Sequence, residues 1–324
     1  MKAIITDYQY ENVNQEKSLI EGAGYMLVAH TTSTPEEIIA AASDADAVIT
    51  QYCNIDKRII SRLQHCRVII KYGIGINNID VDAASRRGIY VCNVPDYGVD
   101  EVSNHAISLY FALNKKLFTL ADALRSGDWG YSSVVPLHRI AGSTLGLAGF
   151  GRIPQSVAKK MKGFDVHILA YDPFCSAEKM SEMGVEKVEL SQLLEESDSI
   201  SIHCPSTPET HHMFNSDAFR AMKKTAFLIN TARGDIIDEA ALIAALEQNV
   251  IAGAGLDVFE REPISKNSPL LHMPNVIATP HSAWYTEESI KALQRSVGEE
   301  VVRVLGGNPP LHPCNIAALK KYGF

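Results

Sequence analysis

The stretch Gly146-Leu-Ala-Gly-Phe-Gly-Arg-Ile-Pro154 decides the fold of this chain. It continues an apolar run from Ser143 that is typical of a short buried strand, and residues 155–162 after it have helical periodicity. A glycine-rich turn between a strand and a helix presents the N–H groups of the helix N-terminus to a pyrophosphate. Asp172 follows Gly151 by about 20 residues, the spacing of an acid that binds the adenosine ribose hydroxyls. The stretch therefore predicts a dinucleotide-binding unit.

The same loop departs from the usual fingerprint at its third position, where Pro154 stands in place of a glycine after Gly149 and Gly151. Proline is tolerated in the first turn of a helix, because its missing N–H would have no helical partner there. Asp172 favours NAD over NADP, since its carboxylate repels a 2′-phosphate and no arginine occurs in residues 173–176. A tight strand–helix turn without a ligand is the alternative, and the acid at the expected spacing argues against it.

The composition is that of an ordinary globular protein. A length of 324 residues corresponds to about two domains, and the formal net charge of −8 argues against a nucleic-acid-binding surface. The six cysteines are scattered without Cys-x-x-Cys pairs, a pattern typical of reduced thiols. No apolar run reaches the ~18 residues of a membrane span, and residues 1–7 are typical of a strand rather than a signal peptide. We expect a cytoplasmic protein that binds neither nucleic acid nor membrane.

Short β-rich runs alternate with helical stretches along the whole chain, which predicts α/β architecture with parallel sheets covered on both faces. The strands are expected at residues 3–6, 25–29, 47–50, 68–71, 89–91, 144–148, 166–170, 199–203, 226–230, 252–256 and 276–278. Helices are expected at residues 35–42, with Thr34 as the N-cap, and at 81–87, 99–125 and 286–305.

Two α/β units follow from this alternation, with the chain crossing between them twice. Residues 1–99 plus 287–324 are predicted to form a discontinuous substrate-binding domain, and residues 100–286 an NAD-binding domain of the Rossmann type. The predicted fold is thus two doubly wound parallel-sheet lobes, Rossmann-like or flavodoxin-like, with a cleft between them that closes on a ligand.

Three candidate catalytic residues, Arg233, Glu262 and His281, lie beyond predicted strands of the second unit. In open parallel sheets, ligands bind outside the carboxyl ends of the strands, so these side chains can converge. Hydride transfer between a hydroxyl and a carbonyl needs a group that moves the hydroxyl proton, which suits His281, and a carboxylate that orients it, which suits Glu262. Arg233 can bind a substrate carboxylate with two hydrogen bonds. Singly, each has a structural alternative (surface arginine, solvated acid, core histidine), but their joint occurrence favours a catalytic site.

The chain resembles the NAD-dependent D-isomer-specific 2-hydroxyacid dehydrogenases over essentially its whole length. Within that family it is most similar to the C-terminal binding protein-like branch and to sequences labelled phosphoglycerate dehydrogenase. Ordered segments carry the resemblance, at residues 71–80, 93–98, 101–106, 149–154, 171–173, 230–234, 255–263 and 280–284.

The resemblance implies a reversible, NAD(H)-dependent reduction of a small 2-oxoacid to the D-2-hydroxyacid, with NAD as the cofactor. It implies that Arg233 binds the substrate carboxylate and polarises the carbonyl, and that His281, paired with Glu262, donates the proton. The predicted substrate contacts are Tyr52, Ile74, Gly75, Arg233 and Trp284. The predicted cofactor contacts are Gly149, Gly151, Arg152, Ile153, Asp172, Cys204, Pro205, Thr210, Thr231, Ala232 and Asp257.

The segment after the third strand limits the substrate. A phosphorylated substrate demands a second cluster of cations, yet residues 50–54 (Thr-Gln-Tyr-Cys-Asn) are uncharged. Lys57 and Arg58 are typical of a solvated helix start, Lys71 belongs to a strand end, and with the sequence ending at Phe324 no appended regulatory domain is expected. We therefore expect a small 2-oxoacid such as glyoxylate, hydroxypyruvate or pyruvate.

Other functions compete with this interpretation. The chain could be an NAD-sensing binding module like the C-terminal binding protein corepressors, or a true D-3-phosphoglycerate dehydrogenase. Zinc dependence through His203, His211 and His212 is disfavoured, because no cysteine or acid stands at ligand spacing, and no metal site is predicted. The resemblance also implies a homodimer, with the predicted helix 99–125 as a candidate contact.

Overall fold

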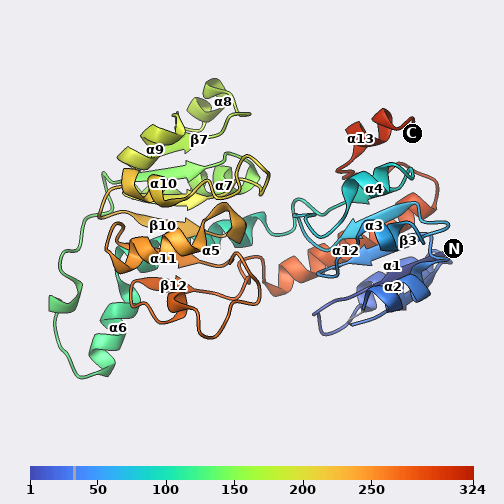
Figure 1. Ribbon diagram of the computed structural model, residues 1–324, viewed down its shortest axis with the longest axis horizontal. Helices are drawn as coiled ribbons and strands as arrows, with labels where there is room; N and C mark the ends of the chain where they lie inside the picture. Colours follow the sequence, from blue (N-terminus) through green and yellow to red (C-terminus); the bar gives the residue numbers. More distant parts are fainter. Residues whose placement is uncertain (32–33) are drawn as a thin grey trace. The chain divides into compact units, whose positions relative to one another are not determined.

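A computed structural model describes residues 1–31 and 34–324. The chain forms two compact units, which we call the first unit (residues 1–98 and 285–324) and the second unit (residues 99–284). Each unit has one parallel β-sheet with helices around it (Figure 1), so the predicted α/β class with two parallel sheets is confirmed.

The first unit has a five-stranded parallel sheet in the order β2-β1-β3-β4-β5, the doubly wound order of flavodoxin-like folds. Its strands are β1 (Lys2–Ile5), β2 (Met26–Ala29), β3 (Ala47–Thr50), β4 (Val68–Lys71) and β5 (Tyr90–Cys92). Its helices are α1 (Asn14–Gly22), α2 (Pro35–Ala42), α3 (Lys57–Ile60), α4 (Val81–Ser85), α12 (Glu287–Leu305) and α13 (Ile316–Lys321).

The second unit has a seven-stranded parallel sheet in the order β12-β11-β10-β9-β6-β7-β8, whose direction of winding reverses between β6 and β9. Its strands are β6 (Thr144–Ala148), β7 (His167–Tyr171), β8 (Glu186–Lys187), β9 (Ser199–Ile202), β10 (Phe227–Asn230), β11 (Gly253–Leu256) and β12 (Val276–Ala278). Its α-helices are α5 (Val99–Asn114), α6 (Leu117–Arg125), α7 (Arg152–Met161), α8 (Ala177–Glu182), α9 (Leu190–Glu196), α10 (Ser216–Ala221) and α11 (Glu239–Glu247). Short 3-10 helices are η1 (Ser132–Val134), η2 (Lys162–Phe164), η3 (Gly234–Ile236) and η4 (Pro269–Leu271).

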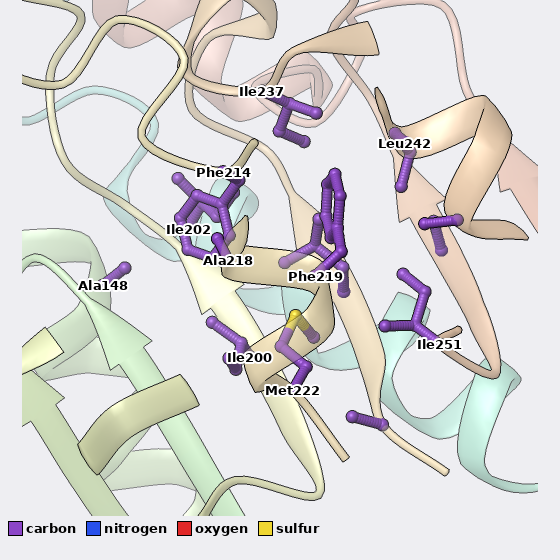
Figure 2. Packing of buried hydrophobic residues seen from close by; sticks show 14 of the residues in the cluster. Ala148, Ile200, Ile202, Phe214, Ala218, Phe219, Met222, Ile237, Leu242 and Ile251 are labelled. Carbon is purple, nitrogen blue, oxygen red and sulfur yellow. The ribbon is translucent and has the colours of Figure 1, made fainter. Parts of the chain in front are cut away.

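The central strands are buried along their whole length, as strands covered on both faces by helices must be. Figure 2 shows part of the core of the second unit, where side chains of β9 and α10 pack together. Ile200, Ile202 and Phe219 there are at most 1% exposed. Burial of such side chains contributes about 1.5–3 kcal/mol each relative to exposure, which fixes the strand ends that carry the site.

One expectation from the sequence, the N-cap of α2, is confirmed at the level of a single residue. Thr34 caps α2 by accepting from the Glu37 N–H at 3.3 Å, and the Glu37 carboxylate accepts from the Thr34 N–H at 2.7 Å. Thr286 caps α12 in the same way, through Ser289. The predicted strands lie within one residue of the observed ones, apart from the two-residue β8, which was missed.

The predicted helix over 99–125 is wrong as a single element. It breaks into α5 and α6 at Lys116, which has a left-handed backbone with φ +48° and whose ammonium donates to Val134 O and Pro136 O. Periodicity could not reveal the break, because both halves are amphipathic. No residue of α6 is buried, and Figure 1 places this helix at the lower left of its unit, away from the sheet.

The predicted helix after the glycine loop begins three residues earlier than expected. Gly151 is the N-cap of α7, and Pro154 is the third residue of the helix. The proline therefore lies in the first turn, where its missing N–H costs no helical hydrogen bond. Within the two described ranges, no helix combines the length and the apolar character needed to cross a bilayer.

Candidate active site

The glycine loop after β6 has two glycines with different physical requirements. Gly149 has φ +98°, and a Cβ there would lie 2.8 Å from the Cys204 backbone nitrogen. Gly151 has ordinary backbone angles, and a Cβ there would meet nothing within 4 Å. Gly149 is thus required by the fold itself, whereas Gly151 leaves open space at the N-terminus of α7.

Asp172 lies against the same loop. One of its carboxylate oxygens accepts from the Phe150 N–H at 2.7 Å, and the other accepts from Phe174 at 2.8 Å and Cys175 at 3.1 Å. The acid after β7 is therefore held by the backbone of the loop after β6. The structure brings together the two parts of the dinucleotide fingerprint that were predicted from spacing alone.

The segment after β9 forms a second wall near the carboxyl ends of the strands. Thr210 Oγ1 donates to Pro205 O at 2.6 Å and accepts from the Thr207 N–H at 2.8 Å, which folds the segment into a compact turn. An open pocket there is lined by Ser206, Thr207, Pro208, His211 and Asp235. The predicted contacts Cys204, Pro205 and Thr210 all belong to this turn.

Thr231, directly after β10, is 8% exposed, and its Oγ1 has no hydrogen-bond partner among the described residues. A buried hydroxyl without a partner costs free energy unless a ligand or water satisfies it. Its position at a carboxyl end of the sheet is the one at which open α/β folds bind ligands. The open space beside Gly151 and this hydroxyl both fit a bound dinucleotide.

The turn that carries Arg233 is shaped by Asn230, the last residue of β10. The buried Asn230 amide donates to Arg233 O at 2.8 Å and accepts from the Ala232 N–H at 2.9 Å. Arg233 Nη1 donates to Ala232 O at 2.6 Å. Gly234 follows, and a Cβ there would overlap the backbone of Phe259. Because only glycine permits this approach, the arginine turn and the segment leading to Glu262 are packed together.

Glu262 and His281 form a close pair. His281 Nδ1 lies 2.6 Å from Glu262 Oε2, and the Phe259 N–H donates to Glu262 Oε1 at 3.0 Å. Burial raises the pKa of Glu262, but the hydrogen bond and charge of His281, the Phe259 N–H and the charge of Arg233 outweigh burial and leave the pKa lowered. Glu262 is therefore a carboxylate at neutral pH and can stabilise a protonated His281.

The backbone at His281 is unusual. Its φ of +53° lies in the left-handed region, which costs a non-glycine residue about 1 kcal/mol or more. The His281 N–H donates to Asp257 O at 2.8 Å, and the Trp284 indole donates to His281 O at 2.9 Å. Asp257, 1% exposed, accepts from the N–H groups of Ser282 and Ala283 through its carboxylate. These contacts fix the turn 279–284 and with it the imidazole.

The first unit places Tyr52 on a loop held by a buried acid. The Asp7 carboxylate accepts from the backbone N–H groups of Gln51, Tyr52 and Cys53 at 3.0, 2.5 and 3.1 Å, and from Thr6 Oγ1 at 2.8 Å. Burial raises the pKa of Asp7, and these hydrogen bonds together lower it by more, so its pKa is below the usual range. Asp7 stays ionised and holds the loop that presents the half-exposed Tyr52.

The loop after β4 is fixed at both ends. The Tyr72 hydroxyl donates to Glu16 Oε1 at 2.6 Å, and the Asn93 amide donates to Ile74 O at 2.7 Å. Gly73 has φ +131°, and no carbonyl of the described chain accepts from the N–H of Ile74 or Gly75. These two donors suit the binding of an anion.

The three histidines considered for zinc have other surroundings. Burial lowers the pKa of His203 to about 3, and its Nε2 lies 2.8 Å from Ser201 Oγ. His211 and His212 stack with ring centroids 3.9 Å apart, and His212 Nε2 lies 2.5 Å from Glu260 Oε1. Over residues 1–31 and 34–324, no three His, Cys, Asp or Glu side chains gather as metal ligands.

Reasoning from the sequence missed the residues that hold the site. Asp7 and His105 act through hydrogen bonds to segments far away in the chain, and His105 lies 3.0 Å from Thr279 Oγ1, whereas Asn230 acts within its own turn. A polar residue directly after a predicted strand was the available signal for Asp7. His105 belongs to the segment 101–106, which was named only as part of the family resemblance and was assigned no role.

Comparisons with known proteins agree with this geometry. Residues 107–283 match the family model described as "D-isomer specific 2-hydroxyacid dehydrogenase, NAD binding domain". The chain is 38% identical over 287 residues to a glyoxylate reductase of Korarchaeum cryptofilum, covering 87% of this chain and 86% of that protein. It is 37% identical over 309 residues to a D-3-phosphoglycerate dehydrogenase of Methanocaldococcus jannaschii, covering 95% of this chain but 58% of that longer protein.

Solved structures share the whole architecture. A glyoxylate reductase from Paecilomyes thermophila superposes with a TM-score of 0.88 at 26% identity, over 97% of this chain and 98% of that one. The predicted resemblance is thus confirmed by a family model over more than half of the chain and by relatives above 30% identity. The chain belongs to the D-isomer specific 2-hydroxyacid dehydrogenase family, and its second unit contains that family's NAD-binding domain.

Proposed function

We propose that this protein reduces a small 2-oxoacid to the D-2-hydroxyacid with NADH, reversibly, and that His281 donates the proton. The observation that carries the proposal is the 2.6 Å contact between Glu262 and His281, beyond the carboxyl ends of the strands of an NAD-binding domain. The names of the relatives, glyoxylate reductases among them, support the same reaction class.

The proton step follows from the geometry of the pair. Glu262 occupies Nδ1 of His281, so Nε2 is the ring nitrogen that holds the transferred proton. In reduction, the imidazolium donates this proton to the carbonyl oxygen, and the lowered pKa of Glu262 keeps its negative charge beside the ring. In oxidation, the neutral ring accepts the hydroxyl proton. NADH, when bound, supplies the hydride.

Arg233 is proposed to bind the substrate carboxylate and to polarise the carbonyl. Its guanidinium can form two parallel hydrogen bonds with a carboxylate, which fixes the direction of the substrate as well as its charge. The hydrogen bonds that Asn230 makes within the turn hold the Arg233 backbone in place. Substrate binding therefore needs to order little besides the Arg233 side chain.

The NAD site is proposed to involve the loop, the acid and the strand ends described above. Gly151 leaves room for the pyrophosphate at the N-terminus of α7, and Asp172 offers carboxylate oxygens to the ribose. The buried Thr231 hydroxyl supplies a polar atom without a partner in the described chain. The proposed contacts also include Gly149, Arg152, Ile153, Cys204, Pro205, Thr210, Ala232 and Asp257.

The substrate contacts of the first unit are proposed to be Tyr52 and the N–H groups of Ile74 and Gly75. Those two donors suit the substrate carboxylate, and Tyr52 suits a side chain with some apolar surface. Trp284 is proposed as a further substrate contact. We further propose that the first unit is the substrate-binding domain and that the second unit is the NAD-binding domain.

The substrate is proposed to be unphosphorylated. Residues 50–54, which follow β3, are uncharged, although the Lys71 ammonium lies 5.5 Å from the centre of the Tyr52 ring. That ammonium donates to Gln51 O. A single cation engaged with the backbone is a weak site for a phosphate dianion, which several donors usually bind. Glyoxylate, hydroxypyruvate and pyruvate are therefore preferred over phosphohydroxypyruvate.

A homodimer is proposed from an exposed apolar surface on the second unit. α6 and the segment after it expose large apolar side chains, and Trp129 is 92% exposed. These exposed residues are Leu117, Phe118, Leu124, Trp129, Tyr131 and Val135. Large exposed apolar side chains grouped along one segment are typical of protein interfaces. Light scattering should give a dimer mass for the native protein, a monomer for Phe118→Ser with Trp129→Ser, and a dimer for the control Leu311→Ser.

A cytoplasmic location is proposed from the cysteines. All six are free thiols, and Cys92 is buried inside the first unit. This usage suits a reducing compartment. Localisation of a tagged protein by cell fractionation tests the proposal, and recovery in a secreted fraction would overturn it.

The experiment that tests the function follows NADH oxidation by the purified protein with a panel of 2-oxoacids. The panel contains glyoxylate, hydroxypyruvate, phosphohydroxypyruvate, pyruvate, and branched and thioether 2-oxoacids. Turnover with an unphosphorylated member supports the proposal, and a strong preference for phosphohydroxypyruvate would make the protein a phosphoglycerate dehydrogenase. NADH binding without turnover on any member would favour a binding module of the corepressor kind instead.

A further inference from the structure

We infer that His105 is a positioning residue for the proton transfer, acting on His281 through Thr279 and Asp257. The inference rests on the proposed function, since it concerns the same histidine. His105 lies on α5, Thr279 follows β12 and Asp257 follows β11, all within the second unit. The three side chains form one chain of polar contacts that ends at the turn carrying His281.

The direction of each hydrogen bond in this chain is determined by the number of protons available. Thr279 Oγ1 lies 2.5 Å from Asp257 Oδ1 and 3.0 Å from His105 Nε2. A hydroxyl has one proton, and the Asp257 carboxylate can only accept, so Thr279 donates to Asp257. Thr279 must therefore accept from His105, which requires a proton on Nε2 of the imidazole. His105 is thus the donor that orients the Thr279 hydroxyl.

His105 also lies beside a buried carboxylate. The Asp257 side chain is 1% exposed, and His105 Nε2 lies 3.7 Å from its Oδ1. A buried carboxylate needs donors on all sides, because an unsatisfied one carries a large desolvation cost. Thr279, Ser282 and Ala283 supply the donors to this carboxylate, and His105 supports the Thr279 donor. Removing His105 frees the Thr279 hydroxyl to rotate. The hydrogen bond from Thr279 to the Asp257 carboxylate is then weakened.

The carboxylate in turn determines where the proton donor lies. Asp257 accepts from the two residues that follow His281, and Asp257 O accepts from the His281 N–H at 2.8 Å. The His281 backbone has φ +53°, a conformation that persists only where neighbouring contacts impose it. Loosening Asp257 therefore lets the turn relax and moves the imidazole away from its productive position. A misplacement of ~1 Å is enough to slow such a step strongly.

The test measures kcat, KM and NADH affinity for single and double variants with the best substrate of the panel. His105→Leu and Thr279→Val should each lower kcat by about 10-fold, a larger effect than the loss of NADH affinity that follows from loosening the proposed cofactor contact Asp257. The double variant should lose no more than Thr279→Val alone, because both act through one chain of contacts. His105→Gln should restore most of the rate, since its amide nitrogen can still donate to Thr279. His167→Leu, an exposed histidine paired with Glu186, is the matched control and should change nothing.

Hydrogen exchange keeps the inference testable without turnover. The amides of residues 279–284 should exchange faster in His105→Leu and Thr279→Val than in the native protein and the control. Unchanged kcat and unchanged exchange in both variants would overturn the inference, as would additive losses in the double variant. A loss confined to NADH affinity would also overturn it and assign these residues to cofactor binding. Absence of turnover in the native protein counts against the proposed function alone, and the exchange result then decides the inference.

Discussion

Two buried aspartates, one in each unit, hold a loop after a neighbouring strand in the same way. Asp7 follows β1 and accepts three backbone N–H groups from residues 51–53 after β3. Asp257 follows β11 and accepts two from residues 282–283 after β12. β1 and β3 are neighbours in one parallel sheet, and β11 and β12 are neighbours in the other. The same arrangement thus occurs twice at the carboxyl ends of parallel strands: an aspartate after one strand accepts backbone N–H groups from the loop after the neighbouring strand.

The two loops differ in what they present. The loop at Asp7 presents Tyr52, an uncharged side chain on ordinary backbone, whereas the loop at Asp257 presents His281 on left-handed backbone. At Asp257, the Thr279 hydroxyl that donates to the carboxylate is itself in contact with His105. The difference indicates that a residue used for shape needs its loop held in place, while a residue that moves a proton also needs the orientation of its own ring fixed.

The largest effect is expected at His281 itself. His281→Ala should lower kcat by about 10² to 10⁴-fold, because no other group occupies the proton-donor position. NADH affinity should stay within about threefold of the native value, as measured by fluorescence titration. The control His167→Ala should keep the native rate. Equal turnover in His281→Ala and the native protein would remove the distinction between the two loops.

The next effect is expected at Arg233. Arg233→Lys should lower kcat/KM by about 10² or more, because a lysine cannot form two parallel hydrogen bonds with the substrate carboxylate. Steady-state kinetics against the exposed control Arg261→Lys measures the loss. A native kcat/KM in Arg233→Lys would mean that substrate binding depends on the loops of the first unit alone.

A smaller effect separates the two glycines of the dinucleotide loop. Gly149→Ala should destabilise the protein by about 2–4 kcal/mol, because its positive φ and the nearby Cys204 backbone leave no place for a Cβ. Gly151→Ala should keep the native stability, since its Cβ would meet no protein atom, but weaken NADH binding by about 10-fold. Thermal unfolding and NADH titration of both variants measure the two quantities. A Gly151→Ala variant with native NADH affinity would place the pyrophosphate elsewhere.

The smallest effect concerns the anchor at Asp7. Asp7→Asn should destabilise the protein by about 2 kcal/mol near neutral pH, because the amide cannot accept from all the donors that surround the carboxylate. The pKa of Asp7 is lowered by folding, so its contribution is present above the unfolded pKa of about 4 and is lost as pH falls through the folded value. The stability difference from the native protein should therefore shrink below about pH 4. Chemical denaturation at several pH values checks this. A difference independent of pH would show that Asp7 acts by shape rather than charge.

The same variant sharpens the comparison with the proton-transfer loop. Asp7→Asn should raise the KM of the substrate with little change in kcat, whereas Thr279→Val should lower kcat. The reverse pattern would contradict the roles assigned to the two loops.

The fold could be predicted from the sequence to the level of strands, because parallel strands buried on both faces are continuous apolar runs with clear boundaries. β8 was missed because Glu186 and Lys187 have no apolar pattern. The division of 99–125 into two helices was missed because the break at Lys116 depends on contacts with Val134 and Pro136, some 20 residues later.

The site could be predicted only in part. Gly149, Gly151 and Asp172 follow from spacing within one βαβ unit, and the structure joins the loop to the acid through the Phe150 N–H. The pairing of Glu262 with His281 was implied by the family and is realised at 2.6 Å. The anchors Asp7 and Asp257 could not be assigned their roles, because each acts through backbone groups of a distant loop. Such contacts leave no periodic signal in a sequence.

One measurement tests the central claim most directly. The native protein is incubated with NADH that carries two deuterium atoms at C4 and with pyruvate or hydroxypyruvate, whichever reacts faster, and the product is analysed by chiral chromatography and mass spectrometry. Our account predicts a single D-2-hydroxyacid with deuterium at C2, formed at least about 10²-fold more slowly by His281→Ala. A product of the L configuration, or bound NADH without any labelled product, would contradict it.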